Sequence, residues 1–326
     1  MKRDAYYDTV KFSLICLVIT GHVFEINRGS DKLTTSLYNF IYLFHMPLFI
    51  FLSGFFSKNT DFKKLIKGSL KLLETYIVFQ IIFYSLTLFC KGSIPSFSDL
   101  SKILIQPYYA LWYLISLVFW KVLMFVFRSV NKKMLVFLSI LIGILIGYVQ
   151  GIGYTLSLSK TIVYFPFFVL GYYCSNTIIE KIRSIPSFIC IPILLLSIVL
   201  CYFFTDVDTY KLITGGRSYY DTGFSTSLSL AIRVIFYPVS VILSISFLSV
   251  IPSSQKIAML GEKTLVFYIY HLFFLLIVSK LLSILHSNLI IDLAASIVIT
   301  LCLVILSKFN FFNKILNPIS LLKAKN

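Results

Sequence analysis

Residues 8–26 read DTVKFSLICLVITGHVFEI, and this stretch decides what kind of protein the chain forms. A helix that crosses a bilayer needs roughly 20 mostly apolar residues. The stretch has that length, and its charged residues are Asp8 and Lys11 near its start and Glu25 near its end. We therefore predict a first membrane span here. Similar stretches recur along the chain, which predicts a bundle of such spans.

The composition of the whole chain agrees with this prediction. Of 326 residues, 58% are hydrophobic and 13% are charged, and the mean hydropathy is +0.91. A soluble domain carries about 25% charged residues, and a disordered chain needs low hydrophobicity and high charge. Both classes are excluded. We expect an all-α, polytopic integral membrane bundle in which residues 1–326 form one membrane-embedded domain, with no separate soluble domain.

Candidate spans are segments long and apolar enough to cross a bilayer. The segment 134–149 is the shortest convincing one, and 161–175 needs flanking residues to cross. We predict about ten transmembrane helices, at 8–26, 37–57, 71–90, 108–127, 134–149, 161–175, 187–205, 226–251, 264–285 and 288–307.

The net charge of +16 follows the positions of the loops. When alternate loops are assigned to the cytoplasm, 19 of the 29 Lys and Arg residues lie there, including Lys2, Arg3, Lys323 and Lys325. Cytoplasmic loops of membrane proteins collect these residues. We therefore expect no nucleic-acid partner. The pattern predicts a multi-pass protein of the cell (inner, or cytoplasmic) membrane with both termini in the cytoplasm, and an uncleaved first span rather than a signal peptide.

The six cysteines do not indicate a metal site. No two of them form a C-x-x-C pair, and most fall in apolar stretches. We expect buried thiols that act as small apolar groups, with no metal and no disulfide framework.

Ionisable side chains in the first span are candidates for a functional site, because a charge inside a bilayer is costly. Lys11 and His22 are eleven positions apart, which places them on one helix face and about 16 Å apart along its axis. Asp8 can pair with Lys11 at a spacing of three, and Glu25 can orient or charge His22. Snorkelling of Lys11 and a packing role for His22 are the alternatives. A cation near the cytoplasm and a titratable base deeper in the membrane suit a substrate with an anionic end and a reactive end.

The second span contains a further histidine beside a proline. His45 precedes Pro47, which breaks the hydrogen-bond pattern of a helix, and Ser53-Gly54 permits close approach of another backbone. His45 lies at a depth similar to that of His22. Two histidines on adjacent spans can share one cavity; a kinked packing helix with one hydrogen-bonded histidine is the alternative.

Other candidate residues lie in or beside later segments. Positive-inside bias explains most of the lysine cluster after the second span, and anion binding by it is the minority interpretation. For Trp112, a place in the aromatic belt at the membrane interface is the alternative to contact with the substrate. These candidates are Lys67 and Lys71 in the cluster, Trp112 at the start of the fourth span, Arg233 in the eighth, and Tyr270 and His271 in the ninth.

The joint order of these motifs resembles the membrane acyltransferase family 3, a group of polytopic O-acyltransferases. In that family, ten residues separate a basic residue from a histidine in the first span, as they separate Lys11 from His22 here. The other similar stretches are His45-Met46-Pro47-Leu48-Phe49 with Ser53-Gly54-Phe55; Lys71 to Tyr76, with Thr75 where a proline is usual; Leu111-Trp112-Tyr113-Leu114; Phe165 to Gly171; and Gly261 to His271, with Thr264 where serine is common and a shorter gap to the histidine.

This resemblance implies transfer of an acyl group, usually acetyl from acetyl-CoA, to a hydroxyl of a sugar, commonly in cell-surface polysaccharide synthesis. The implied partners are acyl-CoA, a sugar or polysaccharide acceptor and the lipid bilayer, with no permanently bound cofactor.

The candidate residues fit such a reaction. Lys11, Lys67 and Lys71 would hold the CoA phosphates. His22 would be the base that takes the proton of the hydroxyl, with Glu25 as its orienter, and His45 and His271 are its competitors. A donor to the developing oxyanion is also needed. Among these candidates His45, Tyr270 and Arg233 stay open for that role, Trp112 is a further candidate substrate contact, and an acyl-enzyme on His22 or Ser53 is a further possibility.

Two other classes of function are compatible with these residues. A transporter or flippase for a lipid-linked sugar would also use intramembrane charges. Transporters often contain paired repeats with broken helices at matching positions, and we find no such repeat in the sequence. The third class is a non-catalytic partner of a polysaccharide synthase or exporter.

Overall fold

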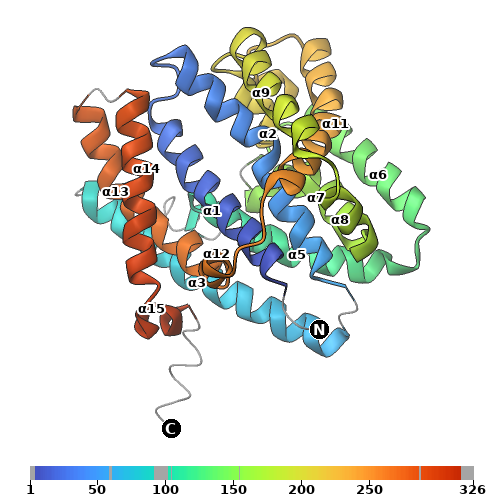
Figure 1. The fold of residues 1–326 in the computed structure, drawn as a ribbon, viewed down its shortest axis with the longest axis horizontal. Helices are drawn as coiled ribbons and strands as arrows, with labels where there is room; N and C mark the ends of the chain where they lie inside the picture. Colours follow the sequence, from blue (N-terminus) through green and yellow to red (C-terminus); the bar gives the residue numbers. More distant parts are fainter. Residues whose placement is uncertain are drawn as a thin grey trace. The chain divides into compact units, whose positions relative to one another are not determined.

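The structure of the chain is a computed structural model that describes residues 4–58, 61–91, 102–103, 105–153, 155–285 and 288–316. Within these ranges the regular elements are all helices (Figure 1), which confirms the all-α prediction. The prediction that the terminal residues lie in the cytoplasm concerns Lys2, Arg3, Lys323 and Lys325, which lie outside the described residues.

Polar residues cap several of the helices. Asp4 accepts a hydrogen bond from the backbone N–H of Tyr6 at 2.9 Å, and asparagines or serines cap others in the same way, which satisfies N–H groups that have no partner within the helix. The helices are α1 (Ala5–Ile26), α2 (Lys32–Phe55), α3 (Phe62–Lys91), α5 (Trp112–Val126), α6 (Lys132–Leu145), α7 (Leu158–Tyr173), α8 (Asn176–Arg183), α9 (Ser187–Phe204), α10 (Thr209–Ile213), α11 (Thr226–Val250), α12 (Gln255–Gly261), α13 (Thr264–Ile284), α14 (Leu289–Leu306) and α15 (Asn310–Ile315).

The number of candidate spans is lower than the predicted ten. Each of the ten predicted segments contains a helix, but within the described residues eight helices are long and apolar enough to cross a membrane, or nine if α7 and α8, bent by 99°, count as one span. The segment 134–149 fails because α6 has 14 residues, a length of about 21 Å, against a bilayer core of about 30 Å. The chain is thus a polytopic helical protein with eight or nine candidate spans.

The end of α6 contacts Tyr219, a residue distant in sequence. The Tyr219 hydroxyl donates a hydrogen bond to the Ile144 carbonyl at 2.7 Å. The Tyr219 ring also lies where a side chain at Gly147 would have to be. A residue 75 positions away from Ile144 therefore packs against the end of α6.

The chain divides into two compact units, which we describe separately. The first consists of Met1–Phe49, Cys174–Ile213 and Ile232–Asn313. In it α1 packs against α12, α13 and α14, and Figure 1 shows α12 beside the start of α1. A Cβ on Gly261 of α12 would overlap the Asp8 carbonyl of α1. This close backbone contact fixes the end of α1 that carries Lys11.

A hydroxyl group compensates for Pro47 inside α2. Proline has no N–H, so the carbonyl four residues earlier loses its helical partner. That carbonyl belongs to Leu43, and it accepts a hydrogen bond of 2.5 Å from the Ser240 hydroxyl of α11. The hydrogen-bond pattern is interrupted at Pro47 as predicted, but α2 continues through it as one helix. This rescue is one of the known ways by which membrane helices tolerate proline.

The second unit consists of Ile50–Tyr173, Thr214–Ala231 and Lys314–Asn326. In it the end of α2 touches α7 backbone to backbone, because a Cβ on Gly54 would overlap the Phe168 carbonyl and one on Gly171 would overlap the Phe51 carbonyl. This contact confirms the close approach that Ser53-Gly54 predicts. In addition, α3 packs on α5, and α6 and α5 pack on α7.

Candidate active site

His22 and Glu25 form a hydrogen-bonded pair on α1. The Nδ1 atom of His22 lies 3.1 Å from Oε2 of Glu25, and the Tyr42 hydroxyl of α2 lies 3.2 Å from the same nitrogen. An ionised carboxylate only accepts hydrogen bonds, so the proton of a neutral His22 belongs on Nδ1. The lone pair then lies on Nε2. This is the arrangement in which a carboxylate fixes the tautomer of a basic histidine.

Three helices of the first unit bring three histidines together. The ring of His271, on α13, stacks on that of His22 with centroids 5.5 Å apart and planes inclined by 20°. The Tyr42 ring contacts both His22, at 6.3 Å, and His45, at 4.6 Å. We call His22, His45 and His271 the histidine cluster. Two of its members were predicted to share a cavity, and the third comes from α13.

The hydrogen bonds of these three histidines differ. His45 Nδ1 donates to the Ile41 carbonyl at 2.7 Å, and His271 Nδ1 donates to the Phe267 carbonyl at 3.1 Å. Each of these bonds reaches a carbonyl one turn earlier, as in an ordinary hydrogen-bonded helix histidine. In contrast, His22 contacts the Glu25 carboxylate. This contact gives His22 the surroundings of a general base.

One buried nitrogen of the histidine cluster has no hydrogen-bond partner among the described residues. This nitrogen is Nε2 of His271. A buried polar atom without a partner costs free energy, and such atoms in a native structure call for an explanation such as a bound water or substrate. The His271 side chain can therefore contact a ligand that reaches His22.

Lys11 lies on the same uninterrupted helix as His22. Its Nζ is 2.6 Å from Oδ1 of Asp8, so the predicted pair is present. Asp8 is buried, with a side chain 3% exposed, whereas the Lys11 side chain is 25% exposed. A buried carboxylate thus anchors the lysine, while solvent still reaches it. The eleven positions between Lys11 and His22 correspond to about 16 Å along α1.

Arg233 and Tyr270 also belong to the first unit. Arg233 is 1% exposed, and its Nε and Nη1 have no hydrogen-bond partner among the described residues. It precedes Ser240 by seven positions, so it shares the face of α11 that contacts α2. The Tyr270 hydroxyl donates to the Phe312 carbonyl at 3.3 Å, which occupies it as a donor.

The remaining predicted residues belong to the second unit. The Ser53 hydroxyl lies 2.6 Å from the Tyr113 hydroxyl. The Trp112 ring stacks on Tyr164 with centroids 5.6 Å apart, and Nζ of Lys160 lies 5.1 Å from the Trp112 ring. The last two candidates, Lys67 and Lys71, are exposed on α3.

Sequence reasoning missed two residues at the histidine cluster. Arg28 lies in the turn after α1, and its Nη1 is 4.0 Å from Oε1 of Glu25; its opposite charge close to Glu25 in the sequence was the one usable signal. Tyr42 gave no such signal, because its contact with His22 depends on how α1 and α2 pack.

Comparisons with known proteins add independent findings. A model of the acyltransferase 3 family, described as an acyltransferase domain, matches residues 4–308. Two proteins described as nodulation protein NolL are similar: that of Sinorhizobium fredii is 28% identical over 195 residues, and that of Mesorhizobium japonicum is 27% identical over 224 residues. These matches cover 56% and 64% of this chain, which spans 51% and 58% of the length of those relatives. No solved structure is significantly similar to the chain.

Proposed function

The chain belongs to the acyltransferase 3 family, and we propose that it transfers an acetyl group from acetyl-CoA to a sugar hydroxyl during the synthesis of a cell-surface polysaccharide. Membership in the family makes it a multi-pass membrane acyltransferase. Three parts of this statement are proposed: the acetyl group, CoA as its carrier, and a sugar as the acceptor. We also propose that residues 1–326 act as one catalytic domain.

The observation that carries the proposed mechanism is the contact between His22 and Glu25 at 3.1 Å. A sugar hydroxyl is a poor nucleophile until a base takes its proton, and a histidine is the usual base near neutral pH. His22 Nε2 takes that proton while the hydroxyl oxygen attacks the thioester carbonyl. The carbon–sulfur bond then breaks, and the proton passes from His22 to the departing CoA sulfur.

The negative charge that develops on the carbonyl oxygen needs a hydrogen-bond donor. Arg233 is the candidate best suited to this role, because it is buried and two of its guanidinium nitrogens have no hydrogen-bond partner among the described residues. The Tyr270 hydroxyl already donates to a backbone carbonyl. His45 remains the second candidate, through its contact with Tyr42 beside His22.

Binding of the donor is assigned to the cytoplasmic lysines. CoA carries phosphates at one end, and charge-assisted hydrogen bonds from Lys11 suit them. The length of α1 between Lys11 and His22 leaves room for the pantetheine arm to reach the base. Lys67 and Lys71 of α3 are proposed as further phosphate contacts, since both are exposed.

This donor site requires a defined topology. We propose that both termini lie in the cytoplasm, because this arrangement places most of the cations there. Reporter fusions at Lys323 and at Lys211 should report opposite sides of the membrane. The same side for both fusions would contradict the proposed topology.

A turnover assay tests the function itself. The purified protein in lipid should release CoA from acetyl-CoA and place labelled acetyl on glycan in membranes from cells that lack the gene. A control reaction without those membranes measures hydrolysis. Transport of the glycan without any transfer of label would instead favour the flippase interpretation and contradict the proposal.

A further inference from the structure

The pair formed by His22 and Glu25 on α1 continues to a third charged residue, Arg28, in the turn that follows the end of α1 at Ile26. Glu25 presents Oε2 to Nδ1 of His22 at 3.1 Å and Oε1 to Nη1 of Arg28 at 4.0 Å. His22 and Glu25 are three positions apart on the last turns of α1, and the turn after the helix brings Arg28 back toward Glu25. Each oxygen of the Glu25 carboxylate therefore faces a different partner.

Two tyrosine rings enclose the guanidinium group of Arg28. Its Cζ lies 3.4 Å from the centroid of the Tyr210 ring and 5.0 Å from that of the Tyr38 ring. A cation over an aromatic face is attracted by the ring, more strongly when water is excluded. The Arg28 side chain is 14% exposed. Its charge therefore acts on Glu25 with less screening than a surface arginine would have.

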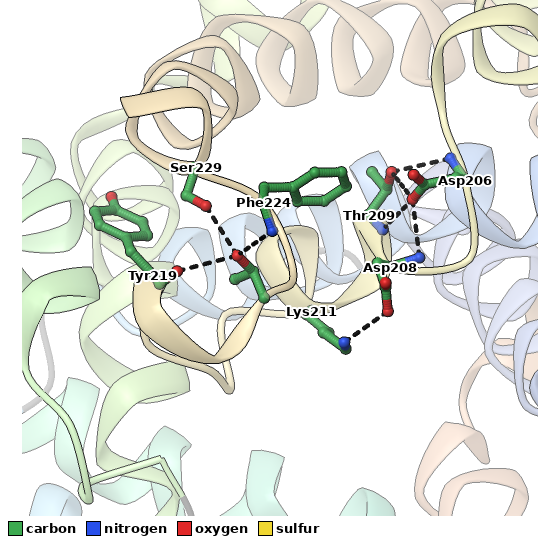
Figure 2. A network of polar contacts seen from close by, with 8 residues as sticks. Asp206, Asp208, Thr209, Lys211, Tyr219, Phe224 and Ser229 are labelled. Atoms are coloured by element: carbon green, nitrogen blue, oxygen red, sulfur yellow. Dashed lines mark hydrogen bonds and ion pairs between the residues drawn. The ribbon is translucent and has the colours of Figure 1, made fainter. Parts of the chain in front are cut away.

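The short helix α10, which supplies Tyr210, is itself fixed by hydrogen bonds. Figure 2 shows Asp206 at its start, where Oδ1 accepts from the backbone N–H of Asp208 at 2.9 Å and of Thr209 at 3.0 Å. Lys211 pairs with Asp208 at 2.6 Å. From α2, the Asn39 side chain donates to the Asp206 carbonyl at 2.9 Å. These contacts hold the Tyr210 ring over Arg28.

Two of the guanidinium nitrogens of Arg28 lack a hydrogen bond. The Nε and Nη1 atoms are buried without a hydrogen-bond partner among the described residues, and an unsatisfied buried donor is destabilising. Attraction to the two rings and to Glu25 acts against this cost. Buried groups that break a local rule in this way are common at sites that act on a substrate.

We propose that Arg28 is a positioning residue that holds Glu25 ionised and oriented toward His22, and that α10 keeps Arg28 in place through Tyr210. This inference rests on the proposed role of His22 as the base. Arg28 does not touch the reacting atoms in this account. It acts on the rate through Glu25, and α10 supports it from outside the long helices.

A double-mutant cycle tests the proposal with labelled acetyl transfer from acetyl-CoA to glycan-bearing membranes. Arg28→Gln should lower kcat about ten- to a hundredfold, the effect of losing one interaction with a charged group, with the KM for acetyl-CoA unchanged. Arg28→Lys should restore part of the rate. In a Glu25→Gln background, Arg28→Gln should add less than a twofold loss, because the carboxylate on which it acts is gone.

Variants of the tyrosine separate positioning from misfolding. Tyr210→Phe should keep the activity, since the ring face makes the contact, whereas Tyr210→Ala should lower kcat. Lys32→Gln is the matched control, because its Nζ lies 4.6 Å from the Tyr202 ring in the same unit without contacting Glu25, and its activity should not change.

Two outcomes overturn the inference: a near wild-type kcat for Arg28→Gln, or a loss that is equally large with and without the Glu25 carboxylate. An active His22→Ala protein would instead refute the proposed base, and with it the premise. The two failures are therefore distinguishable in one set of assays.

Discussion

Replacement of His22 by alanine should lower the rate of acyl transfer about 10²–10⁴-fold, the usual effect of losing a general base. The protein should stay folded and inserted in the membrane, because the His22 ring is partly exposed and its partners Glu25 and Tyr42 remain. The rate is measured with labelled acetyl-CoA, and expression and CoA binding are checked in parallel.

The matched controls are His45→Ala and His271→Ala. Both histidines bond the carbonyl one turn earlier, so each variant should retain more activity than His22→Ala. A His22→Ala protein that transfers at nearly the wild-type rate would remove His22 from the mechanism. Loss of activity in only one of the other two variants would assign the base to that residue.

Replacement of Lys11 by alanine should weaken acyl-CoA binding more than acceptor binding. The loss of one charge-assisted contact to phosphate costs about 1.5–3 kcal/mol, or about ten- to a hundredfold in affinity. Affinity is measured by equilibrium dialysis with labelled CoA.

Two control variants support the measurement of Lys11. Lys11→Arg keeps the charge and the partner of Asp8, so its affinity should stay close to that of the wild type. Lys181→Ala removes an exposed lysine on α8 and should have no effect. Unchanged CoA affinity in a folded Lys11→Ala protein would exclude Lys11 from the donor site.

Helical periodicity accounts for the part of the site that could be predicted. The pairs Asp8–Lys11 and His22–Glu25 lie on one helix, and a spacing of three positions suffices to bring them together. The stacking of His271 on His22 joins residues of different helices. No local pattern encodes that contact, because it depends on how α1 and α13 pack.

Tertiary contacts also decide details of the fold that the sequence alone does not give. Pro47 interrupts the hydrogen-bond pattern of α2 as predicted, and a hydroxyl from α11 satisfies the Leu43 carbonyl. The segment 134–149 reads as a span by composition, but α6 has only 14 residues, and Tyr219 bonds the carbonyl of Ile144 near its end. In both places the partner of a helix carbonyl is a residue distant in sequence.

The central claim, acetylation of a surface sugar that depends on His22, is tested most directly by mass spectrometry of the surface glycan. The glycan is compared among cells with the wild-type gene, cells without the gene, and cells that express His22→Ala at an equal level. The account predicts acetyl groups on the glycan from the first cells and their loss in the other two. An identical acetyl content in all three would contradict it.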